Sequence, residues 1–118
     1  MKKVLIVEDE DCYIDRYTDA LTGKVVLLFA DNVANAIRMF DENTDVAVVV
    51  MDACLSSGSM PNSMPVVKHI REAGYTGDII ANSSSFNRTL KAVGCNLECW
   101  DGSKSLIPKQ LIELLGLQ

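Results

Sequence analysis

Residues 4–11 read VLIVEDED, an apolar run that ends abruptly in four acidic residues. Residues 46–52 read VAVVVMD, so that Asp52 likewise closes an apolar run. Short runs rich in β-branched residues and stopped by polar ones are typical of buried strands in a parallel sheet. Ligands of such sheets bind outside the carboxyl ends of the strands. If these two strands are neighbours, we expect Glu8, Asp9 and Asp52 to meet at one edge of the sheet.

Three carboxylates in one small site repel one another, and they cannot all stay ionised without compensation. A hard divalent cation with oxygen ligands supplies that compensation, and Mg²⁺ suits a site of two carboxylates plus a phosphate. Glu10 and Asp11 have a simpler explanation, because the dipole of a following helix favours negative charge at its start. That explanation does not require Glu8 and Asp9, which together with Asp52 predict a magnesium site.

The composition indicates one globular domain, residues 1–118, with 48% hydrophobic residues and a net charge of −5. This charge gives no basic footprint for nucleic acid. No apolar stretch approaches the ~20 residues that span a bilayer, and no signal peptide precedes the first strand, so we expect a cytoplasmic protein. The cysteines match no zinc-site spacing and are expected to be reduced thiols; they are Cys12, Cys54, Cys95 and Cys99.

Strand and helix patterns alternate along the whole chain. The predicted strands cover 3–7, 25–29, 46–51, 79–81 and 96–100, and three predicted helices cover about 11–22, 86–93 and 107–116. Two further helices are predicted from apolar residues at helical spacing: Val33, Ala36, Ile37 and Phe40 in one, and Val66, Val67 and Ile70 in the other. This alternation implies right-handed crossovers and a parallel sheet covered on both faces. It fits a flavodoxin-like, doubly wound (βα)5 α/β fold with a five-stranded parallel sheet of order 2-1-3-4-5. That order makes the strands at 3–7 and 46–51 neighbours, as the acidic cluster requires.

Local signals mark several helix ends. Gly23 is well placed to end the first helix, which carries Tyr13 and Tyr17 on its apolar face. Asp31 or Asn32 can cap the second helix, and Pro65 fits the first turn of the third.

Three segments resemble one known family, the response-regulator receiver domain of two-component signalling, in its stand-alone chemotaxis type. They are the first strand with its acidic pair (KVLIVEDE, 3–10), Asp52 at the end of the third strand, and the fourth strand with a terminal serine (IIANS, 79–83). The resemblance covers essentially the whole chain. It implies that Asp52 is the phosphoacceptor of a phosphorelay and that Ser83 contacts the phosphoryl group.

The chain departs from the family pattern in two places. The loop at 53–63 is longer than usual and lacks the usual Asp-Gly pair. At the end of the fifth strand, the family's switch aromatic is expected near Glu98 but is missing there, and Trp100 is the only aromatic residue nearby. The family's lysine after the fifth strand falls on Asp101 when counted without gaps. Lys104 can take its place if the loop before it is expanded, and we then expect the Lys104 amine within salt-bridge reach of Asp52.

The resemblance also implies a role for each site residue. Asp52 would attack a phosphoryl group carried on a partner histidine and form an aspartyl phosphate. The Mg²⁺ ligands would be Asp9, Asp52 and the backbone carbonyl of Cys54, with Glu8 acting directly or through water. Ser83 would donate its hydroxyl to one phosphoryl oxygen, and Lys104 would pair with another.

The function so implied is a phosphoprotein that signals by changing its binding to partners, and not an enzyme with an external substrate. The expected partners are a histidine kinase or histidine phosphotransfer protein and a downstream protein, with no direct contact to nucleic acid or membrane. Each residue also has a plainer explanation: Asp52 as a loop cap, Ser83 as a helix cap, Lys104 as a solvated surface residue and His69 as an exposed helix residue.

Two alternative functions remain open at this point. One is a degenerate receiver that is not phosphorylated and binds partners constitutively, which the unusual end of the fifth strand favours. The other is an enzyme of similar fold. A flavodoxin would need a phosphate loop after the first strand, where this chain is acidic. A haloacid-dehalogenase-type phosphatase would use an Asp-x-Asp pattern such as residues 9–11, but it would not explain Asp52.

Overall fold

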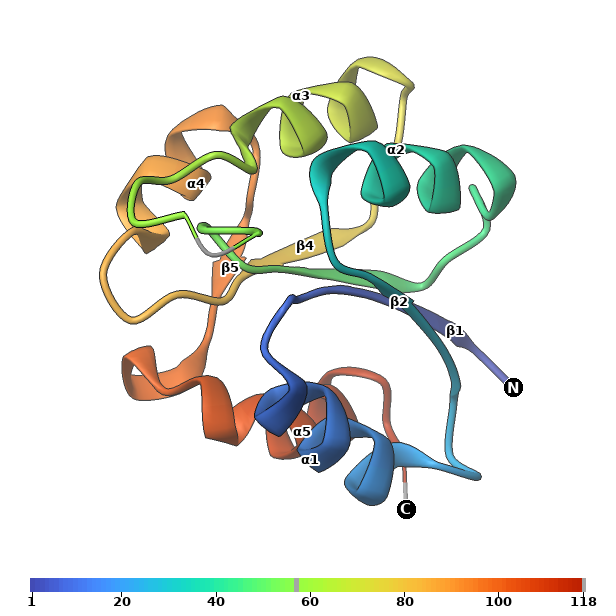
Figure 1. The fold of residues 1–118 in the computed structure, drawn as a ribbon. Helices are drawn as coiled ribbons and strands as arrows, with labels where there is room; N and C mark the ends of the chain where they lie inside the picture. The colour runs from blue at the N-terminus through green and yellow to red at the C-terminus, as the bar shows by residue number, and fades with distance from the viewer. Residues whose placement is uncertain (57, 118) are drawn as a thin grey trace.

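Five parallel strands form one sheet in the computed structural model, which describes residues 1–56 and 58–117. The order is β2-β1-β3-β4-β5, which confirms the predicted doubly wound topology (Figure 1). The strands are β1 (Lys3–Val7), β2 (Val26–Ala30), β3 (Val48–Met51), β4 (Asp78–Ala81) and β5 (Leu97–Glu98).

Helices cover both faces of the sheet. They are α1 (Asp11–Leu21), α2 (Val33–Glu42), α3 (Met64–Glu72), α4 (Asn87–Val93) and α5 (Ile107–Leu114). Helices α1 and α5 lie on one face, and α2, α3 and α4 lie on the other (Figure 1). In the part of the chain so described, no helix has both the length and the apolar character needed to cross a membrane.

The alternation of side chains along β1 explains the two cores. Val4 and Ile6 belong to the apolar cluster on the α1/α5 side, whereas Leu5 and Val7 belong to the cluster under α2 and α3. All four are fully buried. A strand buried on both faces needs a continuous apolar run, and this requirement explains the pattern at 4–7 and again in β3.

Predicted helix ends agree with the structure at three places. Asn32, one of the two candidate caps, accepts a hydrogen bond from the backbone N–H of Asn35 at 2.8 Å. Gly23 adopts a φ of +82° just after α1, and Pro65 lies in the first turn of α3. The fifth strand is shorter than predicted, because the chain turns into a 3₁₀ turn at Trp100–Gly102.

The strand register aligns the carboxyl ends of β1, β3 and β4. Val7 pairs with Met51, and Met51 pairs with Ala81. The next residues continue the pairing, since the Asp52 N–H donates to the Val7 carbonyl at 3.0 Å. Glu8, Asp52 and Asn82 therefore follow their strands at one level of the sheet.

Candidate functional site

The predicted acidic cluster is present at the carboxyl edge of the sheet. Carboxylate oxygens of Glu8, Asp9 and Asp52 lie within 4.8 Å of one another. Glu8 is completely buried, Asp52 is buried and Asp9 is half-buried. The alignment of β1 and β3 brings these side chains together, as the two sequence patterns predicted.

The Lys104 ammonium enters this cluster. Its Nζ lies 2.8 Å from Glu8 Oε1 and 3.4 Å from Asp52 Oδ1, so the expected ion pair with Asp52 is present. The side chain reaches the cluster because two successive 3₁₀ turns, Trp100–Gly102 and Lys104–Leu106, expand the loop after β5. Asp101, the ungapped alternative, is exposed.

Ser83 combines the capping role and the accessible hydroxyl that the sequence left as alternatives. Its Oγ accepts hydrogen bonds from the backbone N–H groups of Ser85 (3.2 Å) and Phe86 (3.1 Å). These bonds occupy the lone pairs of the hydroxyl, so its proton is the part left to donate. Ser83, Asp52 and Lys104 line the same pocket, where that proton can reach a bound anion.

The long loop between β3 and α3 is closed by Asn62. Its side chain accepts from the Leu55 N–H at 2.8 Å and donates to the Leu55 carbonyl at 2.9 Å. The backbone N–H of Asn62 also donates to the Ala53 carbonyl at 2.9 Å. These bonds hold the segment around Cys54 beside Asp52 without the usual Asp-Gly pair.

Comparisons with known proteins give different results for the sequence and for the structure. No family model and no curated protein matches the sequence. The structure, in contrast, superposes on many solved receiver domains. The fold is that of response-regulator receiver domains.

Three solved structures illustrate this likeness to the receiver fold. A two-component response regulator from Clostridium difficile has a TM-score of 0.76 and 17% identity, covering 98% of this chain and 97% of that one. The CheX–CheY–BeF₃–Mg²⁺ complex from Borrelia burgdorferi has a TM-score of 0.72 and 15% identity, covering 97% of this chain and 89% of that one. The complex of the Saccharomyces cerevisiae histidine phosphotransfer protein Ypd1 with the Ssk1 receiver domain has a TM-score of 0.73 and 21% identity, covering 95% of this chain and 87% of that one.

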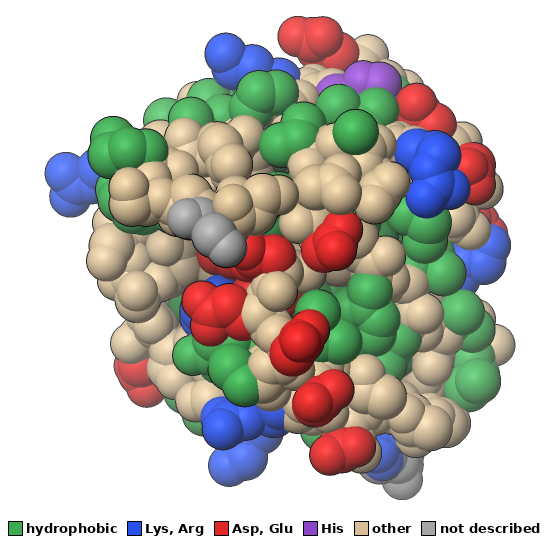
Figure 2. All heavy atoms as spheres, viewed as in Figure 1, with side chains coloured by type: hydrophobic (Ala, Val, Ile, Leu, Met, Phe, Trp, Pro, Cys, Tyr) green, Lys and Arg blue, Asp and Glu red, His purple; other side chains and the backbone are tan. Residues whose placement is uncertain are grey.

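The pocket over the acidic cluster in this receiver fold has a volume of about 740 Å³. Figure 2 shows acidic side chains gathered on the face that Figure 1 presents. The pocket is lined by Asp9, Asp52, Cys54, Ser83 and Lys104 among others, and thus collects most of the predicted site residues. Its volume is large enough for a phosphoryl group together with part of its donor.

Tyr13 is a pocket residue that the sequence placed only in the core. The Lys104 ammonium lies 4.5 Å from the centroid of the Tyr13 ring, within the range of a cation–π contact. The sequence feature that could have indicated this role is the position of Tyr13 in the first turn of a helix that starts beside the acidic cluster. This position keeps the Tyr13 ring close to the site.

Burial and charge shift the acid–base properties of the cluster. Burial and the neighbouring charge of Glu8 raise the pKa of Asp52 to about 7, although the Lys104 ammonium acts in the opposite direction. Burial lowers the pKa of Lys104, but its hydrogen bond to Glu8 and the charge of Asp52 outweigh this effect and raise it overall. The site therefore carries more negative charge than one lysine can neutralise.

This shift predicts a pH dependence of folding stability when divalent cations are removed. The folded state holds a proton on Asp52 up to a pH of about 7, whereas the ordinary pKa is 3.8. Between these values the folded state binds more protons, so stability must fall as pH rises. Urea unfolding in a chelator should show this fall in the wild type. In Asp52→Asn the fall should be smaller, and two parallel curves would contradict the assignment.

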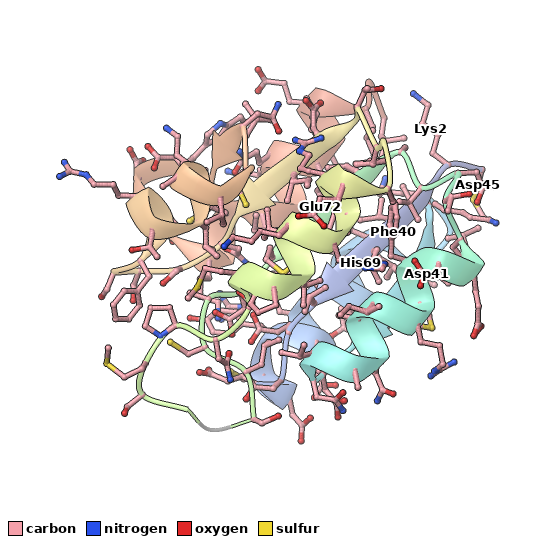
Figure 3. All side chains as sticks on the ribbon, turned by 90° about the horizontal axis from the view of Figure 1, so that it is seen from above. Lys2, Phe40, Asp41, Asp45, His69 and Glu72 are labelled. Carbon is pink, nitrogen blue, oxygen red and sulfur yellow. The ribbon has the colours of Figure 1, made fainter. Side chains whose placement is uncertain are left out.

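His69 lies outside the pocket. Its Nε2 is 2.7 Å from Asp41 Oδ1, and its ring meets the Phe40 ring edge-on. Figure 3 shows these labelled side chains between α2 and α3. The expectation that His69 is exposed is only partly right, because its side chain is 35% exposed and bridges the two helices.

Proposed function

We propose that this domain is a phosphorylation-controlled signalling receiver. It takes a phosphoryl group onto Asp52 from a histidine of a partner kinase or histidine phosphotransfer protein, and it then changes its binding to a downstream protein. The observation that carries this proposal is the convergence of Glu8, Asp9 and Asp52 at one sheet edge, with Lys104 inserted between Glu8 and Asp52.

The proposed reaction is a displacement at phosphorus. A carboxylate oxygen of Asp52 attacks the phosphoryl group, the bond from phosphorus to the histidine nitrogen breaks, and the imidazole leaves with that electron pair. Lys104 neutralises charge on one phosphoryl oxygen, and Ser83 donates its hydroxyl to another. Lys104 also favours the ionised form of Asp52, which is the form that attacks.

The cluster fits a magnesium ion. Its three carboxylates offer hard oxygen ligands within 4.8 Å of one another. Burial, and then the charge of Glu8, raise the pKa of Asp52, and a cation would compensate that negative charge. Glu8, Asp9, Asp52 and the backbone carbonyl of Cys54 would hold it. When bound, Mg²⁺ would neutralise charge on the transferring phosphoryl oxygens.

Phosphorylation would act on two segments of the chain, the one that leads into α4 and the one that leads into α5. Ser83 lies in the first of these segments and Lys104 in the second, and both residues line the pocket. A phosphoryl group adds about −1.5 to −2 charge at neutral pH. The position of Lys104 in the site also weakens the case for a constitutive, unphosphorylated module, which rested on the loss of the usual lysine.

The test of this function is incubation with acetyl phosphate as a small phosphodonor. Intact mass spectrometry should detect one added phosphate per chain when Mg²⁺ is present and none when a chelator replaces it. A chain that gains no phosphate under either condition would support the constitutive binding module instead.

Magnesium should also stabilise the fold measurably. Binding to the folded state raises stability by mass action, so the melting temperature should climb with Mg²⁺ concentration. At a concentration of 100 times Kd the gain is about 2.7 kcal/mol. Asp9→Asn should weaken this response, whereas Asp11→Asn, an exposed acidic residue outside the cluster, should keep it. An equal response in the two variants would refute the ligand role of Asp9.

A further inference from the structure

Two buried polar side chains beside the site have no part in the chemistry described above. Tyr17 of α1 and Asn82 at the end of β4 are both completely buried. Tyr17 belongs to the apolar cluster on the α1/α5 side of the sheet. Burying a hydroxyl and an amide in such surroundings destabilises a fold unless they are hydrogen-bonded, so their partners show what they do.

These two side chains form a hydrogen-bond chain that ends on the backbone of Lys104. The Tyr17 hydroxyl donates to the Lys104 carbonyl at 2.6 Å, and the Asn82 Nδ2 donates to the Tyr17 oxygen at 3.1 Å. The direction is fixed, because a carbonyl only accepts and Tyr17 has one proton to give. Burial raises the pKa of Tyr17 far above its ordinary value, so the hydroxyl keeps that proton.

The Tyr17 hydroxyl ties the Lys104 segment to α1. Asp101 (φ 56°) and Gly102 (φ 64°), which lie shortly before Lys104, have left-handed backbones and are exposed. The side chain of Lys104 must nevertheless end 2.8 Å from Glu8. The Tyr17 hydroxyl fixes the carbonyl of the very residue whose ammonium enters the acidic cluster.

We propose that Tyr17 and Asn82 are positioning residues that hold Lys104 in the phosphoryl-acceptor site. This inference rests on the proposed function of Asp52. Because Asn82 directly precedes Ser83, the chain also links the two groups proposed to bind phosphoryl oxygens, Ser83 and Lys104. Figure 1 shows α1, which carries Tyr17, beside α5 and the segment that leads into it.

Two variants separate positioning from stability. Tyr17→Phe keeps the buried ring and removes only the hydroxyl, but it leaves the Asn82 amide without its acceptor. The double variant Tyr17→Phe/Asn82→Leu replaces both groups with apolar ones, so no donor is orphaned. Tyr75→Phe is the matched control, because the Tyr75 hydroxyl donates to the Val46 carbonyl at 3.1 Å on the opposite face of the sheet.

The first measurement reports the position of Lys104 without any phosphorylation. Its ammonium lies 4.5 Å from the Tyr13 ring centroid, so the ring current should shift the Lys104 ε-methylene protons in the NMR spectrum. We expect this shift to collapse in both Tyr17 variants and to persist in Tyr75→Phe. An unchanged chemical shift in both Tyr17 variants would overturn the proposal. This measurement needs no phosphorylation, so its result is distinguishable from a failure of the proposed function.

The second measurement is the rate of phosphate uptake from acetyl phosphate. Misplacing one catalytic group should slow it by roughly tenfold in Tyr17→Phe and in the double variant. Because Tyr17 acts through Lys104, adding Tyr17→Phe to Lys104→Met should cause no further loss. Losses that multiply would show a general structural effect and would contradict the positioning role.

Discussion

Replacing Asp52 with asparagine is expected to abolish phosphate uptake from acetyl phosphate, with a loss of at least about a hundredfold in rate. Asparagine has nearly the same shape, so the packing of this buried position is kept, but its amide is not a nucleophile that can form the acyl phosphate. Intact mass spectrometry over time, in the presence of Mg²⁺, measures the rate.

The matched control for this variant is Asp45→Asn. Asp45 is exposed and pairs with Lys3 at 3.0 Å just before β3, at the end of the strand opposite the site. It should take up phosphate at the wild-type rate. If Asp52→Asn also kept that rate, the phosphoacceptor would have to be another residue.

Removing the positive charge of Lys104 is expected to give the largest change in stability. In Lys104→Met, Glu8 stays completely buried, and the hydrogen bonds left to it among the described residues come from the backbone N–H groups of Asp9 and Glu10, each 3.2 Å from Oε2. Leaving one member of a buried ion pair without its partner costs about 3–5 kcal/mol. Urea unfolding at neutral pH in a chelator should show a loss of about 3 kcal/mol.

A second substitution tests the cause of this loss. Glu8→Gln removes the buried negative charge, so Lys104→Met/Glu8→Gln should recover most of the stability. Lys109→Met, which changes an exposed lysine of α5, should have little effect. A Lys104→Met variant as stable as Lys109→Met would show that the ion pair contributes nothing to folding.

Much of the fold followed from two apolar runs and the residues that end them. The run at 4–7 and the part of the run at 46–51 that forms β3, Val48–Met51, are buried on both faces, as in a covered parallel sheet, and this indicated that β1 and β3 are neighbours. The strand predicted from residue 46 begins only at Val48. The acidic cluster followed from the same topology, because carboxyl ends of adjacent parallel strands lie at one edge. Strand pairing alone was enough to bring Glu8 near Asp52.

The position of Lys104 was predictable only through charge. The family count pointed to Asp101, whereas an acidic cluster that also receives a phosphoryl group needs a cation within reach. The two 3₁₀ turns that deliver Lys104 left a weak signal, Gly102, whose φ of 64° suits glycine. The ends of β5 also had no clear signal in the sequence. This strand has two residues, and it lies at the edge of the sheet, where it pairs with β4.

The contacts of Tyr17 and Asn82 could not be read from the sequence. These two residues are 65 positions apart, and Tyr17 and Lys104 are 87 positions apart, so only the packing of α1 against the sheet brings them together. Helical periodicity placed Tyr17 in the core and gave no partner for its hydroxyl. Such long-range polar pairs depend on side-chain geometry that period and composition do not encode.

The most direct test of the central claim is the location of the phosphoryl group. After treatment with acetyl phosphate and Mg²⁺, the protein should be digested and the modified residue identified by tandem mass spectrometry. We expect modification of Asp52 that is lost when a chelator replaces Mg²⁺. Modification at any other residue, or uptake at Asp52 that is unaffected by the chelator, would contradict the claim.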